Sequence, residues 1–332
     1  MTEKVELKHG NGGQHMQRLI DRLTRHWAQP TDTTVDAAVF LNHNDTQWLT
    51  TTDGFSVEPL IFPGGSIGSL AVNGTVNDLA VSGALPRFLT LNLFLEEGLE
   101  ITLLETIMAD FANSAQKANV QIIAGDTKVL PRGQVPGILM ATTGLGIKAS
   151  PLTLGTAQIQ PGDAIVSSGT LGDHGAAVML ARQDFGLSGE LLSCCAAVTE
   201  LTQAALAFDG LRFMRDPTRG GLTTVLHDIA RDTRLTPAVF ETSLPIKNET
   251  RSLCDMLGYE PLTLASEGRV IAVVAKNQVD GLVNRWRTLA GGEQATIIGE
   301  MRAGSDEPIL VTALGGEKFI APLLDDPLPR IC

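Results

Sequence analysis

Residues 65–98, GSIGSLAVNGTVNDLAVSGALPRFLTLNLFLEEG, contain the pattern that decides the fold. Ser66 is suited to cap the N-terminus of a small-residue helix over residues 67–82, which Gly83 would end. The apolar run over residues 87–95 then predicts a buried strand. A capped helix that leads directly into a buried strand is typical of an α/β domain.

The alternation of strands and helices extends on both sides of this stretch. Two strand-like runs joined by a polar turn precede it, and a capping box of Thr102 and Glu105 predicts the next helix. A short strand should follow that helix and end at the sequence GDTK, residues 125–128. The predicted strands are 36–41, 47–52, 120–124 and 138–147, and the predicted helix face is Ile101, Leu104, Met108, Phe111 and Ala115.

A second α/β unit begins after a turn at residues 159–163. It contains a strand over 164–168, a glycine-rich turn over 169–175, and the run DPTRGG, residues 216–221, which opens a helix over 222–231. Further helices are expected at about 175–185 and 196–208, with strands near 237–242, 269–275 and 295–300. The predicted class is α/β (α+β), with domains at 1–152 and 153–320 and a flexible tail at 321–332.

Composition excludes several classes of protein. The formal net charge of -12 argues against a nucleic-acid binder, and no apolar run reaches membrane length. The N-terminus MTEKVELKHG lacks the apolar region of a secretory signal. The four cysteines show neither zinc-ligand spacing nor a disulfide framework. These features favour a cytoplasmic globular protein that binds neither nucleic acid nor membrane.

Aspartates beside glycines or strand ends form the most informative polar pattern. Mg²⁺ takes oxygen ligands and usually bridges one or two carboxylates to substrate phosphates. Several carboxylates in one site would repel each other unless a cation were bound. Each of these residues alone is also compatible with a turn or a helix cap. The candidate metal ligands are Asp53, Asp78, Asp126 and Asp216, with Asp36 as a weaker fifth.

Three other features are candidates for phosphate chemistry or proton transfer. Lys128 could neutralise a transferring phosphoryl group, or it could be a surface lysine. Glu267, ahead of an apolar strand, could be a general base or a loop residue. The glycine-rich turn that contains His9, Gly12 and Gly13 could approach a phosphate ahead of a helix over 14–27, or could be a plain turn.

The chain ends in LPRIC, residues 328–332, with a cysteine at the final position. The preceding prolines disfavour helix and central strand, so an extended arm is expected. Ten or so residues could carry the thiol of Cys332 about 30 Å. Without a site for the thiol to visit, a frayed end with an incidental cysteine is the better explanation of the same stretch.

Together these motifs resemble the HypE family of hydrogenase maturation factors, the carbamoyl dehydratases. The resemblance runs from His9 to Cys332, and the terminal PRIC is its most specific element. The matching segments are HGNGG, TTDGFSVEPLIFPGG, GTVNDLAVSGA, AGDTKV, SGTLGDHG, DPTRGG, SEGR and PRIC. The wider superfamily includes aminoimidazole ribonucleotide synthetase, selenophosphate synthetase and thiamine-monophosphate kinase.

The resemblance implies the two-domain aminoimidazole ribonucleotide synthetase-like fold. Its N-terminal sheets would pair in a homodimer with a barrel-like core, and ATP and Mg²⁺ would bind at the domain interface. Many relatives carry two adjacent acids where this chain has only Asp36. The implied metal and nucleotide residues are Asp53, Asp78, Asp216, Arg219 and Gly220, with Gly125, Asp126, Thr127 and Lys128 near the transferring phosphoryl group.

The resemblance also implies a reaction on the tail. HypF would place a carbamoyl group on Cys332, and ATP-dependent loss of water would convert this S-carboxamide into a thiocyanate. The HypC–HypD complex would accept the group as a cyanide ligand of [NiFe]-hydrogenase iron. Glu267 is our hypothesis for the base that removes the nitrogen protons.

Two alternatives remain at this level. The chain could be an ATP-dependent kinase or synthetase of the same superfamily that acts on a small molecule and does not need Cys332. It could also be a non-catalytic nucleotide-binding protein that only carries the modified cysteine. Turnover after deletion of Cys332 and the mass of the modified chain would distinguish these possibilities.

Overall fold

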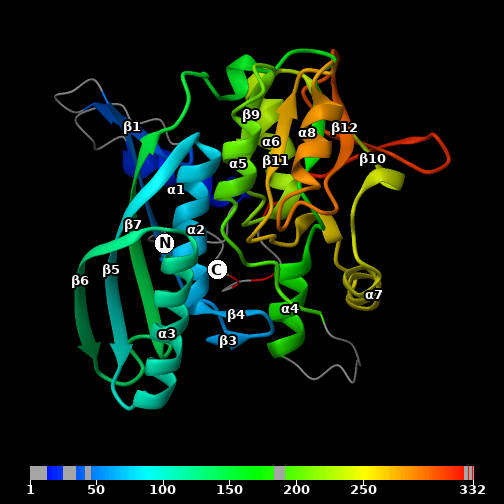
Figure 1. Ribbon diagram of the computed structural model, residues 1–332. Helices are drawn as coiled ribbons and strands as arrows, with labels where there is room; N and C mark the ends of the chain where they lie inside the picture. The colour runs from blue at the N-terminus through cyan, green and yellow to red at the C-terminus, as the bar shows by residue number, and fades with distance from the viewer. Residues whose placement is uncertain are drawn as a thin grey trace.

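The computed structural model describes residues 13–24, 35–41, 46–182 and 191–324, together with Leu328 and Ile331. Two α/β units lie side by side (Figure 1). The first contains a five-stranded sheet in the order β1-β2-β7-β5-β6. Its main elements are α1 (Gly13–Thr24), β1 (Ala38–Leu41), β2 (Gln47–Phe55), α2 (Ile67–Val81), β5 (Ala84–Glu96), α3 (Ile101–Lys117), β6 (Gln121–Leu130) and β7 (Ile138–Lys148), with a small hairpin of β3 (Ile61–Phe62) and β4 (Gly65–Ser66).

Helix α2 is the central element of this unit. Ser66 caps it as predicted, and its side chain forms a reciprocal capping box with Ser69. The small residues along α2 allow close packing on several sides, and a Cβ at Gly68 would clash with the carbonyl oxygen of Ile107 on α3. Almost every residue of α2 is therefore buried, between the sheet, α3 and the second unit.

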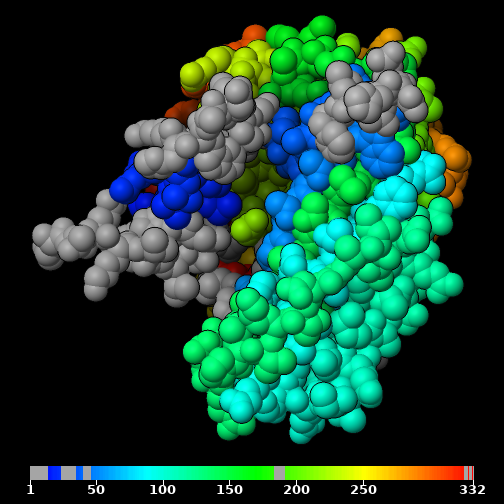
Figure 2. All heavy atoms as spheres, turned by 90° about the vertical axis from the view of Figure 1, so that its left-hand side faces the viewer, coloured from blue at the N-terminus to red at the C-terminus, as the bar shows by residue number. Residues whose placement is uncertain are grey.

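The first sheet has one covered face and one open face. Alternate residues of β5 at positions 89, 91, 93 and 95 are buried toward α2 and α3, whereas Asn92 on the opposite face is exposed. Strand β6 forms the edge beside β5 and is exposed along almost its whole length. Figure 2 looks onto this side of the molecule, where the cyan to green residues form the lower part of the view.

The second unit contains a seven-stranded sheet with helices on both faces. The strand order is β14-β13-β10-β12-β8-β11-β9. One core packs the sheet against α5 and α8, and another packs its opposite face against α6. The elements are β8 (Ala164–Ser167), α4 (Asp173–Arg182), α5 (Thr199–Ala205), β9 (Leu211–Arg215), α6 (Gly221–Thr233), β10 (Thr236–Phe240), α7 (Asn248–Leu257), β11 (Ile271–Val274), α8 (Val279–Trp286), β12 (Thr296–Arg302), β13 (Ile309–Val311) and β14 (Glu317–Phe319), with short 3-10 turns η2 (Thr156–Gln158), η3 (Glu241–Ser243) and η4 (Pro261–Thr263).

Two details of the first unit differ from the sequence-based predictions. Helix α3 begins at Ile101 after Glu100, which makes no side-chain cap, so the Thr102–Glu105 capping box was wrong. The buried residues of α3 are Ile107, Phe111 and Ala115, whereas Ile101 is exposed. Strand β6 was expected to end before the GDTK sequence, but it continues through that sequence to Leu130 because β5 pairs with it throughout.

Two residues of the C-terminal segment lie in the core. Leu328 and Ile331 are 7% and 3% exposed and belong to the same apolar cluster as α4 and the N-terminal unit. At these two positions the prediction of a free arm is wrong, because apolar side chains at a domain interface gain by burial. The domain limits at 152 and 320 stay predictions, although the first sheet ends at Lys148 and the second begins at Ala164.

Candidate active site

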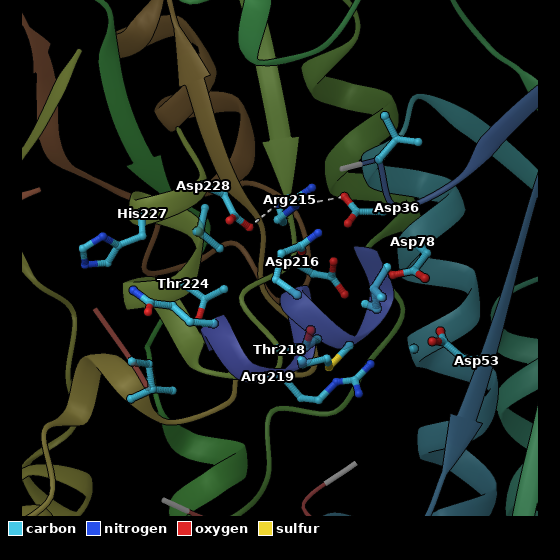
Figure 3. Close-up of a pocket in the computed structure, with 18 of the residues that line it drawn as sticks. Asp36, Asp53, Asp78, Arg215, Asp216, Thr218, Arg219, Thr224, His227 and Asp228 are labelled. Atoms are coloured by element: carbon cyan, nitrogen blue, oxygen red, sulfur yellow. Dashed lines mark hydrogen bonds and ion pairs between the residues drawn. The ribbon is translucent and has the colours of Figure 1, made fainter. Parts of the chain in front are cut away.

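A cavity of about 640 Å³ lies between the two units and is lined by both. Helix α1, the end of β2 and one face of α2 line it from the first unit. The turn between β9 and α6, a face of α6 and Glu267 line it from the second. In Figure 3, Asp216 lies between Asp53 and Asp78 on one side and His227 and Asp228 on the other.

Four of the predicted aspartates converge on this cavity: Asp36, Asp53, Asp78 and Asp216. Burial, followed by repulsion from Asp53 and Asp216, raises the pKa of Asp78 well above its usual value. Burial, and then the charge of Asp36, raises the pKa of Asp216 to about 8. This mutual perturbation is expected where carboxylates share a partly desolvated site.

An arginine that the sequence analysis missed compensates part of this negative charge. Arg215, at the end of β9, bonds Asp36 at 3.1 Å and Asp228 of α6 at 2.9 Å (Figure 3). The pKa of Asp36 is still raised, since burial outweighs the attraction of Arg215. Asp36 is thus committed to an ion pair, which leaves Asp53, Asp78 and Asp216 as the better candidates for a cation. Arg215 belongs to no motif that the sequence analysis identified, so nothing in the sequence marked this role.

Glu267 lines the cavity and is only 1% exposed. Burial is the main cause that raises the pKa of Glu267 to about 8, with further contributions from Asp216 and Asp53. Among the described residues, neither Oε1 of Glu267 nor Oδ2 of Asp216 has a hydrogen-bond partner. Buried polar atoms of this kind normally have partners, so both point to a ligand of the cavity.

The turn before α6 gives the cavity a helix N-terminus. Gly220 and Gly221 have φ angles of +73° and +56°. A Cβ at Gly221 would lie 2.5 Å from the carbonyl oxygens of both Leu262 and Leu264, so this position requires glycine. The first backbone N–H groups of a helix have no partner within it and favour anions. Thr218 and Arg219 line the cavity beside them.

The cavity fits phosphate and Mg²⁺ together better than a bare metal ion. Within the described parts of the chain, no group of three or more His, Cys, Asp or Glu side chains is placed to hold a metal ion. Mg²⁺ typically uses one or two carboxylates, water and substrate phosphate oxygens. The donors present, separated carboxylates facing a helix N-terminus, match that mode of binding.

Comparisons with known proteins place this chain in a family. Residues 34–148 match the N-terminal domain, and residues 160–311 the C-terminal domain, of AIR synthase related proteins. Carbamoyl dehydratase HypE of Rhizobium leguminosarum bv. viciae is 38% identical, with 99% of this chain and 95% of that protein covered. The chain belongs to the HypE family of carbamoyl dehydratases.

Solved structures of HypE proteins have the same fold. HypE in a HypE–HypF complex superposes with a TM-score of 0.87 at 34% identity, covering 92% of this chain and 99% of that one. HypE in complex with ATP superposes with a TM-score of 0.83 at 36% identity, covering 99% of this chain and 100% of that one. Membership of the HypE family favours the carbamoyl dehydratase hypothesis over a kinase or synthetase that acts on a small molecule.

Four residues that the family resemblance placed near the phosphoryl group lie away from the cavity of their own chain. They are Gly125, Asp126, Thr127 and Lys128 on β6. Register pairs Asp53 with Thr142, Thr142 with Leu91 and Leu91 with Gly125. Three strand spacings separate Asp53 from Gly125, roughly 14 Å. Asp126 pairs with exposed Asn92 on the open face, so Asp126 and, two residues on, Lys128 face away from Asp78 and α2.

The remaining predicted site residues lie near the two ends of the chain. His9, Gly12 and Cys332 are outside the described residues. Gly13 is the first residue of α1, whose Gln14 and Gln17 line the cavity.

In the described ranges, no helix is both long and apolar enough to cross a membrane.

Proposed function

We propose that this chain catalyses the ATP-dependent dehydration of an S-carboxamide on its own Cys332 to a thiocyanate. The observation that carries the proposal is the buried Oε1 of Glu267, which has no hydrogen-bond partner among the described residues and lies in the same cavity as Asp53, Asp78 and Asp216. Such a cavity provides a proton acceptor next to an anion-binding helix N-terminus. A carrier without activity would not need a buried base there.

ATP and Mg²⁺ are the proposed cofactors, held by residues of both units. Asp53, Asp78 and Asp216 would hold Mg²⁺, and the α6 N-terminus with Arg219 would hold phosphate oxygens. When bound, ATP supplies the phosphoryl group that makes the amide oxygen a leaving group, and Mg²⁺ neutralises phosphate charge. The products are the thiocyanate, ADP and phosphate, so the amide carbon loses its oxygen and its nitrogen loses two protons.

Glu267 is the proposed acceptor of a nitrogen proton. A general base works best when its pKa lies near the working pH, and the pKa of Glu267 is raised to about 8. Bound cations would favour the ionised form of the same carboxylate, which the base requires. The surrounding burial excludes water that would otherwise compete for the substrate.

A homodimer is part of the proposal because of the open face of the N-terminal sheet. Exposed β6 carries Asp126, Thr127 and Lys128 at the edge of the described sheet, away from the cavity of its own chain. In an isologous pair the same surface of each chain meets its counterpart. We propose that β6 of one chain thereby completes the cavity of the other, with Lys128 near the phosphoryl group.

The proposed partners follow from the proposed chemistry. HypF would supply the carbamoyl group, and the solved HypE–HypF complex of a relative supports this pairing. The HypC–HypD complex would receive the cyanide group. Carbamoylation by HypF would need the reduced thiol of Cys332, which fits a cytoplasmic location.

Intact-mass analysis tests the function directly. The chain is incubated with HypF, carbamoyl phosphate and ATP, and the carbamoylated chain is expected to lose the mass of one water. Glu267→Gln should keep the carbamoyl mass while still binding ATP, and exposed Glu249→Gln on α7 serves as the matched control. Persistence of the carbamoyl form in the unsubstituted chain would refute the dehydratase, and dehydration by Glu267→Gln would remove Glu267 from its role.

A further inference from the structure

In the described part of the C-terminal segment, a hydrogen bond to the backbone of Ile331 adds to the apolar packing at the domain interface. The ring of His174, at the start of α4, lies 2.9 Å from the carbonyl oxygen of Ile331 through Nε2. Both residues are buried, and the ring also packs edge-on against Phe62 of the first unit, with ring centroids 5.3 Å apart. His174 therefore contacts the tail and both units at once.

The partners of His174 define its tautomer. A carbonyl oxygen only accepts, so Nε2 must carry the proton and donate it to Ile331. Nδ1 lies 2.8 Å from Oγ of Ser193, which is then the donor to Nδ1. The same Oγ accepts from the backbone N–H of Cys195 at 3.0 Å, and Ser193 N–H donates to Pro63. A directed chain of hydrogen bonds thus runs from the 191–198 segment through His174 to the tail.

The charge state of His174 suits this arrangement. Burial, with a further contribution from Arg182 on the same helix, lowers the pKa of His174 to about 4, against the opposing effect of Ile331. The neighbouring carboxylate of Asp173 is occupied by Lys247, Thr170 and Thr250. The imidazole is therefore neutral at pH 7, and its donor and acceptor nitrogens remain distinct.

We propose that His174 is the latch of the C-terminal tail, a positioning residue that holds Ile331 and so fixes the point from which Cys332 extends. The proposal rests on the proposed function, in which Cys332 carries the reacting group. A neutral hydrogen bond can break and form again, as a tail that must visit a partner requires. Ser193 has the supporting role of keeping the Nε2 proton on His174.

Alkylation of Cys332 measures latching without the dehydration reaction. The free chain is treated with iodoacetamide, and labelling of the Cys332 peptide is followed by mass spectrometry. His174→Phe keeps an aromatic ring against Phe62 but loses the donor, and we expect labelling to rise roughly fivefold or more. Ser193→Ala should show a smaller increase, and His174→Gln, whose amide can donate, should recover most of the protection.

Gln203→Met is the matched control for this experiment. It removes a similar bond between the two units, from Nε2 of Gln203 on α5 to the carbonyl oxygen of Ala84 at 3.1 Å, which involves neither the cavity nor the described residues of the tail. It should leave Cys332 labelling near the unsubstituted rate. Cys194 and Cys254 are buried with raised pKa values, so their slow labelling reports whether each variant is folded. Unchanged Cys332 labelling in folded His174→Phe and Ser193→Ala would overturn the latch.

The effect of the latch on catalysis is measured in an experiment separate from Cys332 labelling. With chains carbamoylated beforehand, His174→Phe should slow dehydration by a factor similar to its labelling increase, while its affinity for ATP stays unchanged. A structural defect would lower ATP affinity as well. If labelling changes but no chain, substituted or not, loses water, the latch stands and the proposed dehydratase function fails. If labelling changes and dehydration keeps its full rate, His174 does not position the reacting residue.

Discussion

Asn77 on α2 donates from Nδ2 to the carbonyl oxygen of Glu267 at 3.1 Å. The same amide donates to the carbonyl oxygen of Ala196 at 3.0 Å and accepts from the N–H of Val198 at 2.9 Å. One fully buried side chain thus connects the first unit, the 191–198 segment and the proposed base. Satisfied networks of this kind fix geometry in protein interiors.

Asn77→Ala should impair catalysis more than binding. Without the amide, the backbone of Glu267 can shift, and misplacement of a catalytic group by about 1 Å reduces rates roughly 100-fold. Stability should also fall by about 1–3 kcal/mol because buried groups lose partners. The dehydration rate and the ATP affinity of Asn77→Ala are compared with those of Asn73→Ala. Asn73 lies one turn earlier on α2, and its substitution removes a bond to Sγ of Cys195. Equal rates for the two variants would contradict the positioning role.

Mixed dimers test whether Lys128 acts across the proposed interface. Lys128→Ala and Glu267→Gln chains should each be inactive alone. After random mixing, about half of the Lys128→Ala chains would pair with a chain that supplies Lys128. Those chains retain Glu267 and should lose water from their carbamoylated tails, as intact mass would record.

The Glu267→Gln chains are the internal control in the same mixture. They should remain carbamoylated, because their own base is missing in every pairing. If neither chain loses water after mixing, Lys128 does not act across the dimer. Full activity of Lys128→Ala alone would show that Lys128 has no part in the reaction.

Asp36 and Asp53 should respond differently to substitution. Asp36 forms an ion pair with Arg215, whereas Asp53 and Asp78 form none with a cationic side chain of the described residues. Asp53→Asn should therefore weaken Mg²⁺-dependent ATP binding by at least tenfold, since a cation loses a charged ligand. Asp36→Asn should change it much less. Titration calorimetry with and without Mg²⁺ measures both, and equal losses would make Asp36 a cation ligand.

The ligand-free chain should be more stable at pH 5.5 than at pH 8. The pKa values of Glu267 and Asp216 are raised to about 8, so the folded chain holds protons that the unfolded chain has lost above about pH 4. Stability then falls as pH rises through this window. Thermal melts should show a decrease of several degrees between these pH values, on the order expected for a few kcal/mol.

Glu267→Gln should reduce this pH dependence and raise the melting temperature at pH 8, because a neutral amide removes the buried charge. Glu249→Gln should leave the dependence unchanged, since Glu249 is exposed. A Glu267→Gln chain with the same pH dependence as its parent would show that Glu267 ionises normally in the folded state.

The sequence predicted the local elements and the main acidic residues of the cavity. The Ser66 cap, α2, β5 and the helix after Asp216 follow from nearby residues, and Asp53, Asp78 and Asp216 converge because strand ends and helix termini meet at a domain interface. The course of β6 was missed because its length is set by pairing with β5. Arg215 and Asn77 were missed because their partners are distant in sequence, and no local pattern marks such contacts. His174 lies in the predicted glycine-rich turn, but its contact with Ile331 could not be predicted for the same reason.

Burial of Leu328 and Ile331 gives the tail a resting place that any partner must compete with. Removing each side chain from the interface should cost about 1.5–3 kcal/mol. An outward tail is then a minor species in the free chain, less than roughly one molecule in a hundred. A partner that covers the same two side chains replaces the lost burial. Transfer of the tail to a partner therefore exchanges one apolar binding site for another. The tail will occupy the site that buries Leu328 and Ile331 more completely.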